Sequence, residues 1–334
     1  MAPIVVDHAH DVPARRWRAF GGTDLYQHPE WLGLTERLHP STYYYVLGDE
    51  YAIACEVVRA PVPDRWPTSD CRSWEVVGHG ESVLVAGGRR SYGSRVLTAS
   101  SGEAHRTCVA DALDLARSLP CDWVVFPCVP ADDAALLAAL RSAGFTLLPA
   151  ASTCSMTVRW SRIDEYFLSF PRRRRATYRN EWRKPERLGL RIEWGPPDPA
   201  LAYDLAGLEV ALHRKYGSNR SVEEAADGLR AVMQRSDEVG SALVRATRDG
   251  ELAGFAVLVF VGDEAHVRQV GFDYALQPAA NLYFTLLFYE PIRHAVDTGR
   301  WTRIHYGTGS LDAKQSRGCA VTPQLWAGRR SADG

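Results

Sequence analysis

The chain has 334 residues, with 39 basic and 40 acidic side chains and a formal net charge of −1. This near-neutral total excludes a protein whose whole surface is electropositive, and it excludes a protein with a long acidic tail. Hydrophobic residues make up 46% of the chain and aromatic residues 10%, which excludes disorder over most of its length. No apolar run approaches the roughly 18 residues of a membrane helix, so we expect no membrane partner.

The cysteines and the N-terminus bear on the cellular compartment. Seven cysteines are scattered along the chain, and no two are spaced as C-x-x-C, which argues against a disulfide framework and a zinc knuckle. The first residues lack the basic and apolar segments of a secretory signal, so we expect a cytoplasmic protein. His8 and His10 could be drawn as a metal site, but an H-x-H in a terminal tail is more often solvated. We therefore expect no metal ion.

The first half of the chain alternates between strand and helix patterns. Residues Tyr43–Val58 are rich in Tyr and Val and predict a hairpin or a pair of strands. The later predicted elements are a strand over Glu81–Ala86, a helix over Ala104–Leu119, a strand over Asp122–Phe126 closed by Pro127, a helix over Ala134–Ser142 capped by Asp132 or Asp133, and strands over Phe145–Leu148 and Thr153–Trp160.

The second half repeats this order at greater length, and Ser221 with Glu224 predicts a capping box. Each half ends in a helix, a glycine and a strand. This repeated order favours two related α/β domains, 1–160 and 161–330, although any α/β chain could show it. The predicted elements are a helical segment over Ile163–Arg183 interrupted by Pro171, a strand over Leu190–Trp194, helices over Ala200–Tyr216 and Val222–Arg235, a hairpin of Ala242–Arg248 and Leu252–Val261, a strand over Ala265–Phe272, a helix over Leu282–Asp297, a strand over Thr302–Tyr306, a polar loop over Gly307–Gly318 and a short strand over Gln324–Ala327.

One segment is strongly basic. Residues 159–191 contain eleven basic and four acidic side chains, a local charge of +7 that leaves −8 for the remainder. On a helix, Arg172, Arg175, Arg179 and Arg183 fall on one stripe. Such a run is often only a solvated surface. Like charges at these spacings repel, however, and guanidinium groups suit phosphates, so the stripe favours an anionic partner: a nucleotide phosphate, a transfer-RNA backbone or the acidic helix of a carrier protein.

Lysine is rare in this arginine-biased chain. Its three lysines are Lys184, Lys215 and Lys314, and we expect a retained lysine where the chemistry needs an ammonium group. Lys314 lies in the run Ile304–Gly318, where a strand leads into a glycine-bearing segment that also presents Arg317. A lone G-x-G is weak support for phosphate binding, and the segment could equally be a polar turn between two strands.

The order of these segments resembles the Fem-type branch of the GNAT acyltransferase superfamily, which includes peptidoglycan aminoacyltransferases. The resemblance covers 155–330 and is only architectural over 1–154. It implies an α/β fold of two tandem GNAT-like domains, with mixed, mostly antiparallel sheets flanked by helices, and acyl transfer to an amine. The resemblance rests on four features: the Arg-rich helical segment, the hairpin Ala242–Val261, the strand Ala265–Phe272 leading into Asn281–Asp297, and the motif G-x-G-x-x-x-x-K-x-x-R-G after Thr302–Tyr306.

The resemblance also implies roles for single residues. Lys314 would stabilise charge on the reacting acyl group. His305, Tyr306 and Asp273 are the candidate bases, and His305 has the most suitable unperturbed pKa, although a strand histidine more often packs than catalyses. We expect the backbone N–H of Val270 or Gly271 to bind the acyl carbonyl, Arg172, Arg175, Arg179, Arg183 and Arg317 to hold phosphates of the donor or acceptor, and Lys215, Tyr216, Arg268, Asp273 and Tyr283 to contact substrate.

A departure from the family pattern bears on the donor. GNAT enzymes that use coenzyme A hold its pyrophosphate with a glycine-bearing loop after this strand, whereas Asp273–Asn281 has no glycine and contains Pro278. We therefore expect no tightly bound cofactor. The expected donors are, in order, an acyl or aminoacyl thioester on the phosphopantetheine arm of an acyl carrier protein, an aminoacyl-tRNA and acyl-CoA.

The expected acceptor is a small-molecule amine of a specialised biosynthetic pathway. The alternative outside the enzymes is a non-catalytic RNA-binding protein on a degenerate GNAT fold, in which the basic stripe would hold the RNA.

Overall fold

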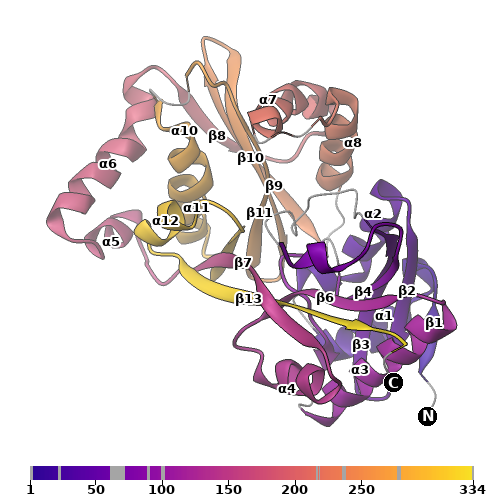
Figure 1. Ribbon diagram of the computed structural model, residues 1–334. Helices are drawn as coiled ribbons and strands as arrows, with labels where there is room; N and C mark the ends of the chain where they lie inside the picture. Colours follow the sequence, from indigo (N-terminus) through magenta and orange to yellow (C-terminus); the bar gives the residue numbers. More distant parts are fainter. Residues whose placement is uncertain are drawn as a thin grey trace. The chain divides into compact units, whose positions relative to one another are not determined.

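The computed structural model describes residues 3–21, 24–60, 72–88, 91–98, 102–215, 217, 219–234, 238–276 and 280–332. The chain divides into two compact units, and its elements are labelled in Figure 1. The first unit comprises Met1–Cys154, Thr308–Asp312 and Val321–Gly334, and the second comprises Ser155–Gly307 and Ala313–Ala320. The domains predicted from the sequence were 1–160 and 161–330, whereas in this division residues 155–160 belong to the second unit and residues 308–312 and 321–334 to the first. Among the described residues, none of the helices has the length and apolar content needed to cross a bilayer.

The first unit contains a sheet with neighbours in the order β1-β2-β3-β4-β6-β13-β7, and β5 lies beside β3. Strands β4 and β6 run parallel, whereas β1–β2, β2–β3, β3–β4 and β6–β13 are antiparallel pairs. The strands are β1 Ile4–Val6, β2 Thr42–Leu47, β3 Tyr51–Arg59, β4 Ser82–Ala86, β5 Leu97–Thr98, β6 Trp123–Pro130, β7 Thr146–Thr157 and β13 Ala320–Arg330. The helices are α1 Ala14–Gly21, α2 Pro29–Leu38, α3 Glu103–Ser118 and α4 Ala134–Ser142, with 3-10 turns η1 Ala9–Asp11, η2 Leu25–Gln27 and η4 Arg72–Val76.

Helices pack on both faces of this sheet because its strand residues alternate between the faces. On one face, Ile53 of β3 joins a core with Val109 and Ala112 of α3. On the other face, Tyr45 of β2 packs with Trp17 of α1. The sequence predicted α3 and α4 from their helical spacing, but it did not predict β1, α1 or α2.

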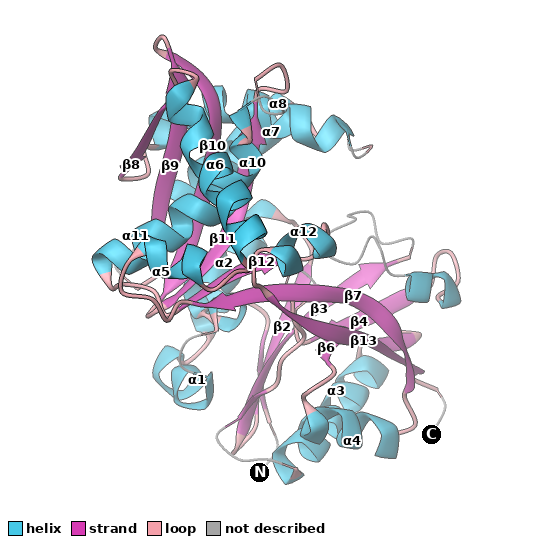
Figure 2. Cartoon of the chain, turned by 90° about the vertical axis from the view of Figure 1, so that its left-hand side faces the viewer, coloured by secondary structure: helices cyan, strands magenta, loops and turns pink. Residues whose placement is uncertain are grey.

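The second unit contains strands in the order β12-β11-β10-β9-β8. Among the described strands of this unit, only β11 and β12 pair in parallel, since β8–β9, β9–β10 and β10–β11 are antiparallel. Helices α7 and α8 lie on one side of the long strands, with α10 and α11 on the other (Figures 1 and 2). The strands are β8 Arg191–Gly195, β9 Gly240–Arg248, β10 Glu251–Val261, β11 Glu264–Phe272 and β12 Arg303–Gly307. The helices are α5 Ile163–Leu168, α6 Arg172–Arg187, η5 Pro199–Leu201, α7 Ala202–Lys215, α8 Val222–Met233, α10 Leu282–Phe284, the π-helical η6 Thr285–Tyr289, α11 Glu290–Thr298 and α12 Leu311–Ser316.

The predicted α/β class with mostly antiparallel sheets is confirmed, but the end of one strand was predicted wrongly. Strand β6 continues through Pro127 to Pro130. The register explains why: Phe126 pairs with Ala327 and Val129 with Leu325, so two residues of β6 face the single residue Trp326. This is a bulge, a position in which a strand tolerates a proline without an N–H group.

Two further predictions were wrong about strand ends. The segments predicted as two strands, Phe145–Leu148 and Thr153–Trp160, form the single strand β7. The predicted short strand Gln324–Ala327 extends over Ala320–Arg330 as β13.

The predicted polar loop Gly307–Gly318 was also wrong in part, because it contains α12. Distant tyrosines hold the end of this short helix. The Tyr178 hydroxyl donates to the Ser316 carbonyl at 2.7 Å, and the Tyr166 hydroxyl donates to the Arg317 carbonyl at 3.0 Å. Carbonyls at a helix end need partners from outside the helix, and here only the tertiary structure supplies them.

The capping box predicted for α8 is present. Ser221 Oγ accepts a hydrogen bond from Glu224 N at 3.1 Å, and a Glu224 carboxylate oxygen accepts one from Ser221 N at 2.9 Å. We expect Ser221→Ala to lower the free energy of unfolding by about 1 kcal/mol, because α8 loses its N-cap. Urea denaturation measures the difference. Ser142→Ala, at an exposed site that ends α4, is the control and should change stability by less than about 0.5 kcal/mol.

Candidate active site

Strands β11 and β12 begin side by side and then part. Parallel pairing joins Glu264–His266 to Arg303–His305, while β11 continues beside β10 as far as Phe272. The register with β10 shifts at Arg268, which is left as an extra residue between Val267 and Gln269. Such a bulge bends and twists its strand. We call Val267–Phe272 of β11 and Tyr306–Gly307 of β12 the strand fork.

The buried polar atoms of the strand fork include Gln269 Oε1 and the Tyr306 hydroxyl oxygen, which have no hydrogen-bond partner among the described residues. Such atoms are rare in folded proteins unless water or a ligand meets them. The Tyr306 ring stacks on Phe288 of η6, with ring centroids 4.7 Å apart. Burial raises the pKa of Tyr306 well above its ordinary value. Tyr306 is therefore a protonated phenol at neutral pH, suited to donate a hydrogen bond and unsuited to act as a base.

Lys314 brings a buried positive charge to the end of β12. Its side chain is held by α12 and is only 3% exposed. Lys314 Nζ donates to the Tyr306 carbonyl at 2.7 Å and to the Gly307 carbonyl at 3.2 Å. These bonds fix the backbone where the strand fork begins. Because the surroundings have a low dielectric constant, the ammonium acts on nearby charge more strongly than it would in water.

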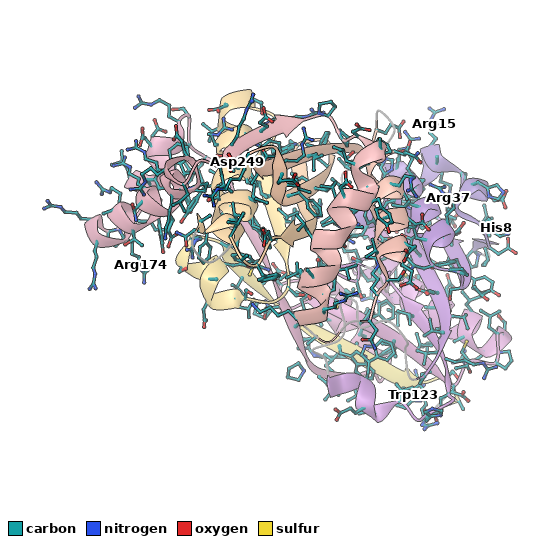
Figure 3. The ribbon with its side chains drawn as sticks, turned by 90° about the horizontal axis from the view of Figure 1, so that it is seen from above. His8, Arg15, Arg37, Trp123, Arg174 and Asp249 are labelled. Atoms are coloured by element: carbon teal, nitrogen blue, oxygen red, sulfur yellow. The ribbon has the colours of Figure 1, made fainter. Side chains whose placement is uncertain are left out.

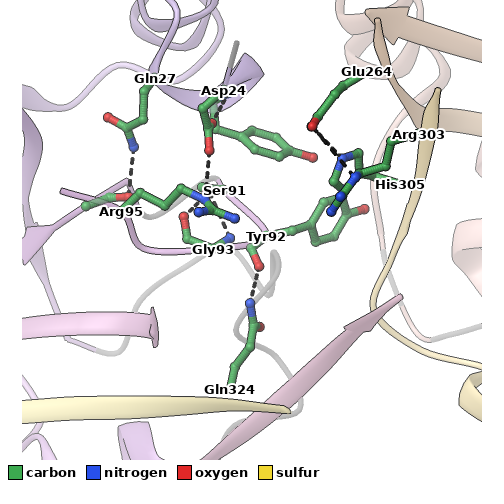
Figure 4. A network of polar contacts seen from close by, with 12 residues as sticks. Asp24, Gln27, Ser91, Tyr92, Gly93, Arg95, Glu264, Arg303, His305 and Gln324 are labelled. Atoms are coloured by element: carbon green, nitrogen blue, oxygen red, sulfur yellow. Dashed lines mark hydrogen bonds and ion pairs between the residues drawn. The ribbon is translucent and has the colours of Figure 1, made fainter. Parts of the chain in front are cut away.

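His305 lies on the opposite face of β12 from Tyr306, since adjacent strand residues alternate. Its Nε2 is 2.8 Å from Glu264 Oε2, and Figure 4 shows this carboxylate beside both His305 and Arg303. The hydrogen bond from His305 lowers the pKa of Glu264. The predicted catalytic residues His305 and Tyr306 thus point to different sides of the sheet, and His305 has a carboxylate to orient its imidazole.

The His305 ring also stacks on His266, with centroids 4.3 Å apart and an interplanar angle of 7°. Sequence reasoning missed both Glu264 and His266. Their spacing of two on a strand was the available signal, because it puts both side chains on one face. The cross-strand register that sets His266 against His305 has no local sequence signal.

Arg317, which the sequence predicted as a phosphate ligand, is buried in the core of the second unit. Its guanidinium is 2.8 Å from Glu181 Oε2 and packs on Phe284, with 3.2 Å between the guanidinium carbon and the ring centroid. Tyr289 donates a hydrogen bond to the same Glu181 oxygen at 2.5 Å. This guanidinium is engaged inside the protein, so its place argues against a role in holding phosphate.

The predicted arginine stripe on α6 is divided between half-buried and exposed side chains. Arg175 donates to the Phe170 carbonyl at 3.3 Å, and Arg179 forms an ion pair with Asp164 at 2.8 Å, so both are turned toward α5. The outward side chains are those of Arg183 and of three consecutive arginines at the start of α6, of which Figure 3 labels Arg174. We call Arg172, Arg173 and Arg174 the α6 arginine cluster.

The α6 arginine cluster lies at an unfavourable place for cations. The first turn of α6 has no acidic residue, and its N-cap, Pro171, offers no side-chain hydrogen bond. None of the three arginines forms an ion pair with a described residue. The N-terminus of a helix carries a partial positive charge, which repels the three exposed guanidinium groups there. An anionic partner would relieve this repulsion.

Three of the remaining predicted residues lie on β11 at the strand fork. Arg268 is the bulged residue, and Val270 is half-buried. Gly271 permits a close approach of α7, because a Cβ there would lie 2.6 Å from Glu209 N.

The other predicted substrate contacts lie beyond this strand. Lys215 Nζ is 5.1 Å from the centre of the Tyr274 ring. The Asp273 carboxylate accepts from Ala275 N at 2.8 Å and so shapes a turn, while Tyr283 packs on Phe272. Tyr216 and residues 277–279 of the predicted donor loop lie outside the described residues.

Comparison with known proteins gives a family match over part of the chain. Residues 172–315 match the family model of the acetyltransferase (GNAT) domain. The sequence has no significant match among curated proteins.

Solved structures resemble the chain over nearly its full length. The crystal structure of FemX superposes with a TM-score of 0.66 at 13% identity and covers 98% of this chain and 97% of that one. The C-terminal domain of a protein described as a lysylphosphatidylglycerol synthetase from Agrobacterium fabrum gives a TM-score of 0.60 at 12% identity, covering 96% and 92%. A tandem GNAT protein from the clavulanic acid biosynthesis pathway gives 0.56 at 13% identity, covering 99% of each chain. These likenesses confirm the predicted tandem GNAT-type fold.

Proposed function

Because residues 172–315 match the family model of the GNAT acetyltransferase domain and the chain has a Fem-like fold, we propose that the protein is an N-acyltransferase that joins an activated acyl or aminoacyl group to an amine. In this reaction the amine nitrogen attacks the acyl carbonyl carbon, and the bond from that carbon to the donor's sulfur or oxygen breaks. The amine loses a proton, and the departing thiol or hydroxyl gains one. The observation that carries the proposal is the strand fork, with the buried ammonium of Lys314 at its β12 side.

Each side of the strand fork has a distinct task in this proposal. The backbone N–H of Val270 or Gly271 binds the acyl carbonyl, and the Lys314 ammonium stabilises the negative charge that develops on its oxygen. His305 accepts the proton of the amine, with its imidazole oriented by the Glu264 carboxylate at 2.8 Å. Tyr306 remains protonated and lies on the opposite face of β12 from His305, so it can donate a hydrogen bond on that face and is not a second base for the amine.

The donor in this proposal is an acyl or aminoacyl thioester on a carrier protein, and the α6 arginine cluster receives the carrier's acidic surface. Support comes from the exposure of these arginines at the positive end of a helix. An aminoacyl-tRNA is the second candidate, because planar guanidinium groups also suit phosphate oxygens. Acyl-CoA remains the third donor, since the sequence 273–281 offers no glycine to a pyrophosphate.

Donor assays test the function directly. The purified protein is incubated with an acyl carrier thioester, an aminoacyl-tRNA or an acyl-CoA, with the small-molecule fraction of a cell extract as the amine source. We expect a new amide with the carrier thioester, insensitive to ribonuclease. Product that disappears with ribonuclease selects aminoacyl-tRNA. Absence of amide with every donor, together with tight RNA binding, would favour the non-catalytic RNA-binding alternative.

The combined variant Arg172→Gln/Arg173→Gln/Arg174→Gln tests the docking surface. We expect KM for the macromolecular donor to rise about tenfold or more with kcat nearly unchanged, because long-range attraction is lost and the strand fork is untouched. The dependence of donor affinity on salt should weaken at the same time. Donor-concentration series at two salt concentrations measure both effects.

A matched control removes two arginines from the exposed side of α3, in Arg106→Gln/Arg117→Gln. KM should stay within about twofold of wild type in this control, because these arginines already have acidic neighbours three residues away. Equal changes in the two variants would show that net charge, and not the α6 arginine cluster, attracts the donor.

A further inference from the structure

Three potential metal ligands converge where β11 and β12 pair. Glu264 and His266 lie on one face of β11, and the register sets His266 directly beside His305 of β12. One carboxylate oxygen and one nitrogen from each imidazole all lie within 4.8 Å of one another. His266 is 5% exposed, and the side chains of His305 and Glu264 are 25% and 29% exposed. The cluster is thus partly shielded and is held by two paired strands.

The chemistry of this cluster suits a divalent transition-metal ion. Two imidazoles and one carboxylate are a donor set that Zn²⁺ favours, and three protein ligands leave a coordination position open. Zinc bonds of about 2.0–2.2 Å allow two donors on one ion to lie up to about 4.3 Å apart. The three ligand atoms of this cluster lie within 4.8 Å of one another, a distance that exceeds the zinc-bound separation by about half an ångström. Rotation of the stacked imidazoles about their Cβ–Cγ bonds would close that gap.

We propose that Glu264, His266 and His305 bind a single divalent transition-metal ion, with Zn²⁺ as the preferred species. The ion takes the place of the proton in the hydrogen bond between His305 Nε2 and Glu264 Oε2, and that proton moves to His305 Nδ1, so that the imidazole binds in its neutral form. Arg303 approaches the other Glu264 oxygen, Oε1, with its Nε at 3.8 Å, so Oε2 remains the oxygen for the ion. The site differs from the H-x-H of His8 and His10 considered from the sequence.

Metal binding at this cluster does not depend on acyl transfer. If His305 is the base of the proposed reaction, its Nδ1 accepts the proton of the amine, because its Nε2 faces Glu264. An ion on Nε2 leaves the imidazole proton on Nδ1, so Zn²⁺ inhibits the transfer. Inhibition rests on the proposed function, whereas binding rests only on the three side chains. A protein that binds the ion without being inhibited would contradict the assignment of His305 as the base, whereas a protein that binds no ion would contradict the metal site.

Titration of the untagged, full-length protein with Co²⁺ tests the proposal, because Co²⁺ bound by nitrogen and oxygen ligands absorbs visible light and reports its own coordination. We expect one ion per chain with micromolar or tighter affinity, and displacement of Co²⁺ by Zn²⁺. Absence of the absorption bands at millimolar Co²⁺ would overturn the proposal.

Variants then locate the ion. His266→Gln, His305→Gln and Glu264→Gln should each weaken Co²⁺ binding at least about tenfold. His10→Gln and His294→Gln are matched controls and should bind as wild type does, since His294 stacks on Trp194 away from the cluster. Unchanged Co²⁺ affinity in all three cluster variants would show that the ion binds elsewhere and would contradict the proposal.

Thermal unfolding covers the case in which a cluster variant folds poorly. Zn²⁺ should raise the Tm of the wild type and of both controls. An equal rise in folded Glu264→Gln, the variant closest in shape to the wild type, would also contradict the site.

Discussion

Replacement of Lys314 by methionine is expected to lower kcat for acyl transfer at least about a hundredfold, because the strand fork loses its buried ammonium. Methionine fills a volume similar to the lysine stem and has no charge. Lys314 also donates to the carbonyls of Tyr306 and Gly307, so we expect a loss of about 1–3 kcal/mol in unfolding free energy. Single-turnover kinetics with the identified donor measure the first effect, and urea denaturation measures the second.

The two effects of Lys314→Met can be separated by temperature. Activity is measured where both proteins are fully folded, so a purely structural loss would leave kcat close to the wild-type value. Lys215→Met is the control, since it removes another lysine of the same unit, which packs over Tyr274. It should alter KM more than kcat if it contacts substrate. A kcat within about threefold of wild type for Lys314→Met would refute the catalytic assignment.

Arg317→Met is expected to lower the free energy of unfolding of the second unit by about 3–5 kcal/mol, because it leaves the Glu181 carboxylate without its cation in a largely buried place. The Arg317 side chain is 5% exposed and that of Glu181 is 15% exposed. Tyr289 still donates to Glu181 and cannot supply a charge. Urea denaturation measures the loss, followed by the fluorescence change of the transition that unfolds the second unit.

A surface ion pair and a double variant are the controls for Arg317. Arg230→Met breaks an exposed pair with Asp227 and should cost less than about 1 kcal/mol. Glu181→Gln/Arg317→Met removes both charges, and we expect it to be more stable than Arg317→Met alone. If Arg317→Met lowers the free energy of unfolding no more than Arg230→Met does, the buried ion pair between Arg317 and Glu181 does not stabilise the fold.

Local patterns predicted most elements of the second unit. The hairpin of β9 and β10 follows from Asp249-Gly250 between two apolar runs, and its turn has positive φ at both residues. The interruption of the basic helical segment follows from Pro171, which separates α5 from α6. These signals act over a few residues, which is why a single sequence reveals them.

Elements that depend on distant partners were beyond prediction. Helix α12 reads as a polar loop because the tyrosine hydroxyls that hold its end come from residues far away in sequence. Strand β13 belongs to the first unit although it follows the second in the chain. Its pairing with β6 is a contact between segments separated by about two hundred residues, and no local pattern encodes it.

The residues of the candidate site were also only partly predictable from the sequence. Sequence reasoning selected Lys314 and His305, and the structure places one at the start of the strand fork and the other beside Glu264. It also selected Arg317, whose burial against Glu181 depends on how α6 packs. A residue type indicates what chemistry is possible, but only its neighbours decide whether a charge faces solvent or the core.

By itself the sequence determined the α/β class, most helices and strands of the second unit, and the excess of positive charge in residues 159–191, because periodicity, turn residues and charge are local properties. Only the tertiary structure decided which of those arginines remain exposed, where β11 and β12 part, and that Glu264, His266 and His305 meet on one face. Those features arise from strand register and helix packing, which join residues far apart in the chain.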